Sequence, residues 1–253
     1  MEFKPSASKS HPRYLSLYYR DLLSYGVKKG ITSLQGLTAH GRGEAFDYLL
    51  GEKTHSFSHS AIRCAAALLL TAKYPVISVN GNTAILVPME LIKLAKVTGA
   101  RVEVNLFHNS KNREKKIAAY LKKLGASEVL LPDKSRIAGL ESNRGFVSVK
   151  GQKIADVVFV PLEDGDRTGK LIHVGKKVIT VDLNPMSRTA QAATITIIDN
   201  IVRAMPRLLA EIKSLREKKR EILLEIIKEY NNKTVLDQAL MAINSRLIIL
   251  AGS

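Results

Sequence analysis

Apolar residues along this chain follow two alternating patterns that predict strands and helices in turn. Short runs rich in Val and Ile predict strands at residues 76–79, 102–106, 128–131, 156–160, 177–182 and 194–198. Between them, apolar residues three and four positions apart predict helices at residues 83–98, 109–124 and 167–174. Because strands that alternate with helices are joined by crossovers, the pattern predicts the α/β class, with a mostly parallel sheet flanked by helices.

Helices are also predicted at both ends of the chain. The polar residues 1–10 are expected to be mobile, and helices follow at residues 14–29, 43–51 and 60–73. A long helix is predicted over residues 200–230. It carries a heptad stripe formed by Ile201, Met205, Leu208, Ile212, Leu215, Ile222 and Ile226. Either residues 235–250 or a second subunit covers this stripe, and we favour a homodimer that uses the helical extension at residues 200–253.

The composition is that of a folded globular protein, and 253 residues are enough for one α/β domain. Lys and Arg outnumber Asp and Glu by 39 to 23, which gives a net charge of +16 and favours anionic partners. Nucleic acid, anionic lipid and phosphorylated metabolites all fit that charge. The chain has no Trp and only 6% aromatic residues, which disfavours single-strand binding by base stacking.

Cysteine and histidine content gives little sign of a disulfide or a metal site. The single cysteine, Cys64, fits a reducing compartment and lies in an Ala/Leu run typical of a buried segment. His55 and His59 lie near it, but no second ligand cluster completes a zinc site, so no metal-ligating side chains are predicted. The sequence shows neither a signal peptide nor a membrane-length apolar run, so we expect a cytoplasmic protein without a membrane partner.

In open α/β sheets, ligands bind beyond the carboxyl ends of the strands, and two polar segments follow predicted strands directly. In the first, residues 80–83, Gly81 permits a tight turn and Asn82 can cap a helix that binds phosphate or carboxylate. In the second, residues 182–189, Asp182 can accept hydrogen bonds from ribose hydroxyls, while Arg188 and Thr189 suit phosphate. Ordinary Asn-capped and Asn-Pro turns remain the alternatives.

Three further segments carry candidate chemistry. Arg42 lies between two glycines where a helix is predicted to begin, which favours phosphate contact, although neither a P-loop nor a Gly-x-Gly-x-x-Gly motif is present. A loop at residues 107–109 precedes Arg113. The acidic residues 163–166 either hold Mg²⁺ through water or cap the next helix.

Seven segments together resemble the archaeal 4-phosphopantoate–β-alanine ligase family, also called phosphopantothenate synthetase. They are HPRY (residues 11–14), GIT (30–32), AHGRGEAFDYL (39–49), SVNGNT (78–83), EVNLFH (103–108), VPLEDGDR (160–167) and DLNPMSRTA (182–190). The resemblance implies a homodimer with a Rossmann-like core. It also implies that ATP, 4-phosphopantoate and β-alanine become 4'-phosphopantothenate, AMP and pyrophosphate in coenzyme A biosynthesis.

The resemblance also implies roles for individual residues. ATP contacts fall on Arg20, Arg42, Asp182, Leu183, Asn184, Arg188, Thr189, Asn200 and Ile201. For phosphopantoate we expect Asn80, Gly81, Asn82 and His108 at neighbouring strand ends, with Arg13 as a further candidate.

The expected mechanism is attack of the pantoate carboxylate on ATP, followed by displacement of AMP by the β-alanine amine. Arginines such as Arg42, together with Mg²⁺, neutralise phosphate charge, and His40 or the loop at residues 163–166 is a candidate base. The alternatives are a nucleic-acid-binding protein, which the net charge motivates, and another nucleotide-dependent enzyme on the same fold.

Overall fold

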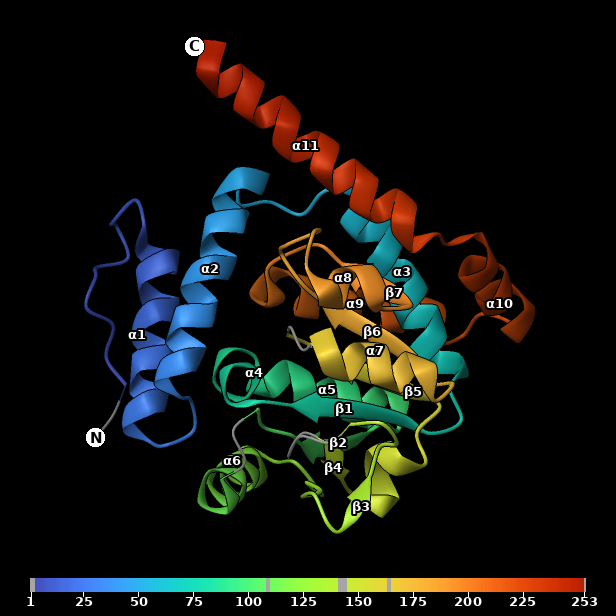
Figure 1. Ribbon diagram of the computed structural model, residues 1–253. Helices are drawn as coiled ribbons and strands as arrows, with labels where there is room; N and C mark the ends of the chain where they lie inside the picture. The colour runs from blue at the N-terminus through green and yellow to red at the C-terminus, as the bar shows by residue number, and fades with distance from the viewer. Residues whose placement is uncertain (1–2, 108–109, 141–144, 163–164, 253) are drawn as a thin grey trace.

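A five-stranded parallel sheet lies at the centre of a computed structural model that describes residues 3–107, 110–140, 145–162 and 165–252 (Figure 1). In spatial order the strands are β2 (Arg101–Val104), β1 (Pro75–Val79), β5 (Val157–Val160), β6 (Lys177–Val181) and β7 (Ile195–Ile197). Every adjacent pair in this sheet is parallel, which confirms the predicted α/β class. The strand predicted at residues 128–131 contributes only one isolated bridge, from Leu130 to Glu103.

The order of the strands reverses beside β1. The chain passes from β1 to β2 on one side and then returns to β5 on the other side, so β1 and β5 flank a topological switch point. In such sheets a crevice opens at the carboxyl ends of the two strands, because their crossover helices lie on opposite faces.

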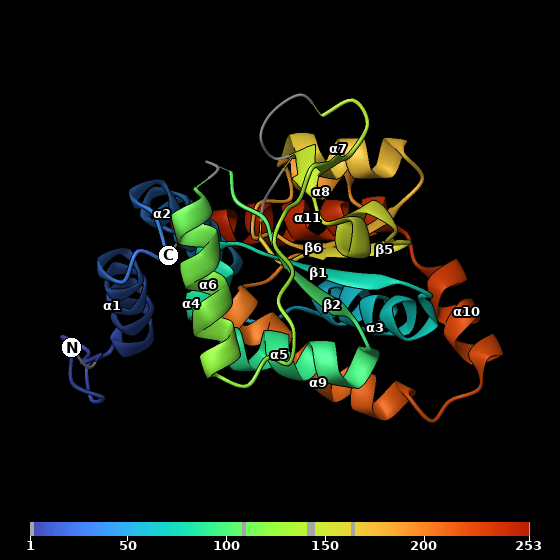
Figure 2. The same ribbon diagram turned by 90° about the horizontal axis from the view of Figure 1, so that it is seen from below.

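Alternating side chains along the strands pack into two cores, one on each face. Figure 2 shows the helices that cover the two faces of the sheet. On one face, Ile77 and Val79 pack with helices α3 (Ser56–Thr71), α5 (Pro88–Thr98) and α9 (Ile201–Leu215). On the other face lie α7 (Gly165–His173) and α8 (Arg188–Ala192), together with the short β3 (Ser135–Arg136), β4 (Phe146–Val147) and the π-helical turn η2 (Val149–Lys153). Helix α6 (Lys111–Lys123) follows β2.

The helix predicted at residues 83–98 is two helices, α4 (Gly81–Leu86) and α5. Pro88 is the first residue of α5 and cannot donate a backbone hydrogen bond to the preceding turn, so the helix breaks at Val87.

Two N-terminal helices, α1 (Tyr14–Lys28) and α2 (Leu34–Leu50), stand beside the sheet (Figure 1). The expectation that a helix begins at residue 43 is wrong, because Ser33 caps α2 ten residues earlier by accepting from the backbone N–H of Gly36 at 3.2 Å. Glycines lower helix propensity and obscured this start. Gly36 is needed for close packing, since a Cβ atom there would collide with the Asn82 side chain.

The helix predicted over residues 200–230 is also two helices, α9 and α10 (Arg220–Glu229). Residues 216–220 form an unbroken charged run, REKKR, which offers no apolar face to bury and leads into the turn between them. Helix α10 packs against α3, with Leu223 buried and Ile222 40% exposed. The heptad stripe therefore ends after Leu215.

The stripe on α9 belongs to the core of this chain. Its five residues from Ile201 to Leu215 are at most 3% exposed, and α9 packs against α3 and α5. Neither residues 235–250 nor a second subunit is needed to cover it.

Helix α11 (Asn232–Gly252) closes the fold and extends away from it (Figure 1). Val235, Leu236, Ala239 and Ile243 are buried against the body, whereas Leu247 to Leu250 are exposed. Within the described chain, α11 is the one helix long and apolar enough to cross a membrane by length and composition, with a mean hydropathy of 1.3. The expectation that no segment reaches this length was too strict. Partial burial of α11 is typical of a helix that joins a protein core.

Candidate active site

A cavity of about 520 Å³ opens at the carboxyl ends of the strands, where the switch point lies. Its volume falls within the range of small-molecule sites, about 300–1,000 Å³. Residues from the ends of β1, β2, β5 and β6 form its floor, and α2 forms a wall. Three arginines contribute to the lining in the described parts of the chain: Arg42, Arg113 and Arg167.

At the β6 end, the turn after the strand is held by its own side chains. The Asp182 carboxylate accepts from the backbone N–H of Asn184 at 2.9 Å and from the hydroxyl of Ser187. The Asn184 side chain accepts from the backbone N–H of Met186 at 2.9 Å. Asp182 and Asn184 line the cavity, so this segment is both an Asn-Pro turn and a cavity wall.

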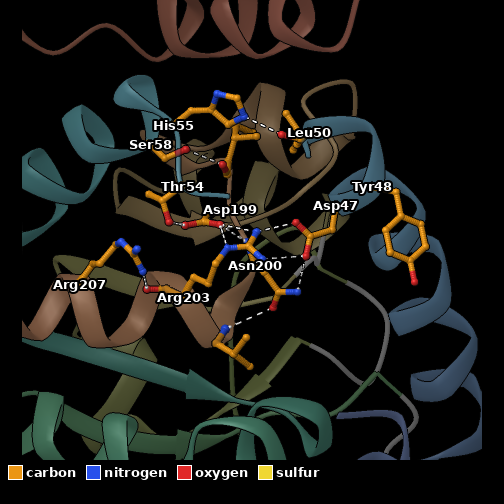
Figure 3. Close-up of polar contacts among 12 residues, drawn as sticks. Asp47, Tyr48, Leu50, Thr54, His55, Ser58, Asp199, Asn200, Arg203 and Arg207 are labelled. Carbon is orange, nitrogen blue, oxygen red and sulfur yellow. Dashed lines mark hydrogen bonds and ion pairs between the residues drawn. The ribbon is translucent and has the colours of Figure 1, made fainter. Parts of the chain in front are cut away.

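A buried ion cluster fixes the adjoining wall (Figure 3). Arg203 Nη1 donates to Asp47 Oδ2 at 3.0 Å, and its Nε donates to Asp199 Oδ1 at 2.8 Å. Asn200 Nδ2 donates to Asp47 Oδ2 at 2.8 Å, and Thr54 Oγ1 donates to Asp199 Oδ2 at 2.6 Å. Asp47 and Asp199 are at most 5% exposed. This cluster ties α2 to the start of α9 and sets Asn200 at the cavity.

Neighbouring polar contacts hold the loop between α2 and α3 (Figure 3). His55 Nε2 lies 2.7 Å from the Leu50 carbonyl oxygen, and Ser58 Oγ donates to the Ile198 carbonyl at 2.6 Å. Burial raises the pKa of Cys64 to about 12, so the thiol stays protonated. No group of three His, Cys, Asp or Glu residues within the described ranges could hold a metal ion.

At the β1 end, Asn80 rather than Asn82 caps the following helix. Asn80 Oδ1 accepts from the Thr83 backbone N–H at 3.0 Å, and Thr83 Oγ1 accepts from the Asn80 backbone N–H at 3.0 Å. Asn82 Nδ2 instead donates to the Gly36 carbonyl at 2.8 Å and joins α4 to α2. At Gly81 a Cβ atom would collide with the Ile31 carbonyl, so only glycine fits this approach.

A buried charged network below the β1 and β2 ends escaped the sequence analysis. Glu103 is fully buried; it accepts from the backbone N–H groups of Ser148 at 3.1 Å and Gln152 at 2.7 Å. Burial raises its pKa to about 7 despite these donors and the nearby Arg167. Arg167 is 2% exposed; it donates to Ser78 Oγ at 2.9 Å and to the Gln152 side chain. A glutamate between two valines of a predicted strand, Glu103, is the feature of the sequence that indicates such a buried charge.

Comparisons with known proteins agree with the motifs. Residues 57–246 match the family described as Phosphopantothenate/pantothenate synthetase, well over half of the chain. The chain belongs to the phosphopantothenate/pantothenate synthetase family. The 4-phosphopantoate–beta-alanine ligase of Thermococcus kodakarensis is 52% identical over 246 residues, 96% of this chain and 94% of its own. The protein of that name from Methanosarcina mazei is 49% identical over 242 residues, 96% of each chain. The family resemblance derived from the sequence is thereby confirmed.

In this synthetase chain, most of the residues singled out in the sequence meet at one cavity. Those that line it are His40, Arg42, Asn80, Gly81, Asn82, Asp182, Leu183, Asn184, Asn200 and Ile201. They come from α2, from the turn after β1, from the turn after β6 and from the start of α9. His108 lies outside the described residues, as do Glu163 and Asp164 of the acidic loop.

Neither Arg13 nor Arg20 lines the cavity: Arg13 directly precedes α1, and Arg20 lies within it. Arg20 Nε donates to Glu44 Oε2 at 3.1 Å, and Arg13 Nη2 donates to the Tyr48 hydroxyl at 2.7 Å. Burial opposes ionisation of Glu44, but hydrogen bonds from Ser16 and Tyr48 and the charge of Arg20 outweigh it and lower its pKa. Glu44 itself lines the cavity, so both arginines reach the site only through it.

The α8 residues are also outside the lining. Arg188 begins α8; its highly exposed side chain lies 3.6 Å from Asp166 Oδ1. Thr189 is fully buried. A ligand longer than the cavity would be needed to contact the Arg188 side chain.

His40 has the properties of a proton acceptor. It lines the cavity, and burial lowers its pKa more than the neighbouring Glu44 raises it. The imidazole is therefore neutral at neutral pH and has a nitrogen free to accept a proton.

Breaking the Arg203 cluster should destabilise the protein strongly. Arg203→Met leaves two buried carboxylates without their cation, which is expected to lower the free energy of unfolding by about 3–5 kcal/mol. Arg216→Met removes the exposed pair with Glu217 and should change it by less than about 1 kcal/mol. Urea denaturation of both variants measures the difference, and equal stabilities would contradict this role of Arg203.

Proposed function

We propose that this chain is an ATP-dependent ligase that joins 4-phosphopantoate and β-alanine to give 4'-phosphopantothenate, AMP and pyrophosphate. The observation that carries the proposal is the cavity at the switch point, in a chain about half identical to relatives named for the same ligation. Its binding partners are ATP, 4-phosphopantoate and β-alanine, and it acts in coenzyme A biosynthesis in the cytoplasm.

The proposed reaction has two steps. The pantoate carboxylate attacks the α-phosphate of ATP, which forms phosphopantoyl adenylate and releases pyrophosphate. The β-alanine amine then attacks the acyl carbon, loses a proton and displaces AMP. Neutral His40, which lines the cavity, is our candidate to take that proton.

Nucleotide binding is proposed for the β6 side of the cavity. Asp182, Leu183 and Asn184 face it after β6, and Asn200 and Ile201 begin α9 beside them. Arg42 lines the same cavity from α2 and can neutralise phosphate charge. Arg20 and Arg188 contact ATP only if it extends past the lining, and the Thr189 side chain is fully buried beside Arg188.

Magnesium is proposed to enter with ATP. Mg²⁺ commonly keeps several waters and is held by phosphates with one or two carboxylates, so a dedicated protein cage is not required. Asp182 is the carboxylate of the lining on the proposed nucleotide side, since both oxygens of Asp199 are engaged by Arg203 and Thr54. When bound, the ion neutralises charge on the phosphates.

The first test is the complete reaction with each component omitted in turn. AMP and 4'-phosphopantothenate should form in equal amounts only when ATP, Mg²⁺, 4-phosphopantoate and β-alanine are all present, as followed by mass spectrometry. ATP turnover without the amide product would indicate a different nucleotide-dependent enzyme. If ATP is not consumed at all, salt-dependent nucleic-acid binding becomes the next activity to test.

Arg42→Ala should lower kcat/KM by about 100-fold or more, because a preorganised charge at the reacting phosphates is lost. Arg63→Ala is the matched control, since Arg63 is exposed on α3 and pairs with Glu211 away from the cavity. Steady-state kinetics of both variants decide the point. A rate for Arg42→Ala equal to that of Arg63→Ala would remove Arg42 from the mechanism.

We propose further that a second copy covers the exposed end of α11. Met241, Leu247, Ile248, Ile249 and Leu250 are between 46% and 69% exposed, and such a cluster of apolar side chains is typical of an interface. The last helix lies within the extension at residues 200–253 that we expect to form the homodimer contact, whereas the α9 stripe in the same extension is covered by this chain.

Light scattering after size-exclusion chromatography tests the dimer. The wild type should have twice the mass of the chain, and Ile248→Glu should give the mass of one chain because a charge would be buried in the interface. Leu15→Glu, at an equally exposed position on α1, is the control. A monomeric wild type would refute the dimer, and a dimeric Ile248→Glu variant would refute this surface.

A further inference from the structure

Asn105, at the β2 end of the cavity, presents a buried hydrogen-bond acceptor that has no partner among the described residues. It directly follows β2, is 5% exposed, and its backbone N–H donates to the Val79 carbonyl at 2.8 Å. Its Nδ2 donates to the Phe146 carbonyl at 3.1 Å, which fixes the orientation of the amide. Its Oδ1 is buried and has no hydrogen-bond partner among the described residues. Since Asn105 lines the cavity, a ligand can supply the missing donor.

Arg113 presents the complementary group at the same end. It lies in the first turn of α6, where Ser110 Oγ accepts from its backbone N–H at 3.3 Å. Its Nε is buried without a hydrogen-bond partner in the described parts of the chain, and the residue lines the cavity. Burial lowers the pKa of Arg113, and the neighbouring Glu114 opposes this, so the guanidinium stays charged. It offers charge-assisted donors to an anion.

Arg167 adds a second guanidinium to this end. Arg167 Nη1 donates a hydrogen bond to Ser78 Oγ on β1, and Ser78 lies opposite Glu103 in the sheet. Asn105 comes two residues after Glu103 and therefore lies on the same face. Two cations at one end of a cavity favour an anionic ligand and disfavour one that carries an ammonium group.

We propose that Asn105 and Arg113 recognise the acid substrate, with Arg113 binding an anionic group of 4-phosphopantoate and Asn105 Oδ1 accepting a hydrogen bond from its 2-hydroxyl. This inference rests on the proposed function. In ionised 4-phosphopantoate the 2-hydroxyl is the one donor, because the phosphate and the carboxylate only accept.

The other substrates fit this end less well. The β-alanine carboxylate can pair with a guanidinium, but the donor that β-alanine offers to Asn105 Oδ1 is its ammonium group, which would then lie beside Arg113 and Arg167. The ribose hydroxyls of ATP are proposed to lie by Asp182 after β6, three strand spacings from β2, or about 14 Å. Asn105 is therefore a specificity-determining residue for a 2-hydroxy acid.

The sharpest test removes the hydroxyl from the substrate. With 4-phosphopantoate that lacks its 2-hydroxyl, wild-type kcat/KM should fall about 10- to 100-fold, because the buried Asn105 Oδ1 stays unsatisfied. Asn105→Leu should use both acids with kcat/KM values within about 3-fold of each other. Equal use of both acids by the wild type, or full discrimination by a folded Asn105→Leu, would overturn the proposal. If the Asn105→Leu variant does not fold, the wild type's use of the two acids decides the question.

Arg113→Gln tests whether Arg113 binds an anionic group of 4-phosphopantoate. The KM for 4-phosphopantoate should rise about 10-fold or more, while the KM values for ATP and β-alanine change less than about 3-fold. Lys111→Gln removes the same charge from an exposed position on the same helix and should leave all three unchanged. A rise in KM for β-alanine or ATP instead would assign Arg113 to that substrate and refute the proposal.

Direct binding separates this inference from the proposed function. Calorimetry with 4-phosphopantoate alone should show binding to the wild type and at least 10-fold weaker binding to Arg113→Gln. If ligation fails but this difference is found, the proposed function is wrong and the acid site stands. If ligation succeeds without the difference, only the acid site is wrong.

Discussion

The buried ion cluster around Arg203 is the interaction on which the shape of the cavity depends. Helix α2 contributes one wall, yet Arg203 and Asp47 lie 156 positions apart in the chain. The attraction to Arg203 offsets the desolvation of two buried carboxylates only when their remaining lone pairs also accept hydrogen bonds. Asn200 and Thr54 donate these bonds. A wall held by directed bonds has one position, whereas apolar packing alone would allow α2 to slide.

The strand order separates the two groups of cavity residues that we propose bind the nucleotide and the acid substrate. Asp182 and Asn184 lie after β6, while Asn105 lies after β2 on the far side of the switch point. A ligase must bring a carboxylate to a phosphate and then admit an amine, so its two large substrates need neighbouring sites that meet in the middle. Carboxyl ends of parallel strands meet along one edge and provide such sites.

Burial shifts the pKa of the Glu103 carboxylate under the cavity and fixes the hydrogen bonds of its neighbours. Glu103 would be an ordinary carboxylate in water, but in the sheet its pKa is raised to about 7, and it accepts from Ser148 and Gln152. Gln152 in turn accepts from Arg167, so residues far apart in the chain share one network. A guanidinium fixed in this way needs no reorganisation when an anion binds, which is the property that electrostatic preorganisation requires.

The sequence by itself determined the alternation of strands and helices, the parallel sheet and the polar turns at Asn80 and Asp182. These depend on local periodicity and on the rule that sites follow strand ends, so they can be read without knowing which elements touch. Only the tertiary structure decided what covers each apolar face and which charges pair. The stripe on α9 shows the reason: a heptad period states that a face is buried, but not whether α3 or another subunit buries it. Likewise, the partners of Arg203, Glu103 and Arg167 are set by long-range packing, which no local pattern encodes.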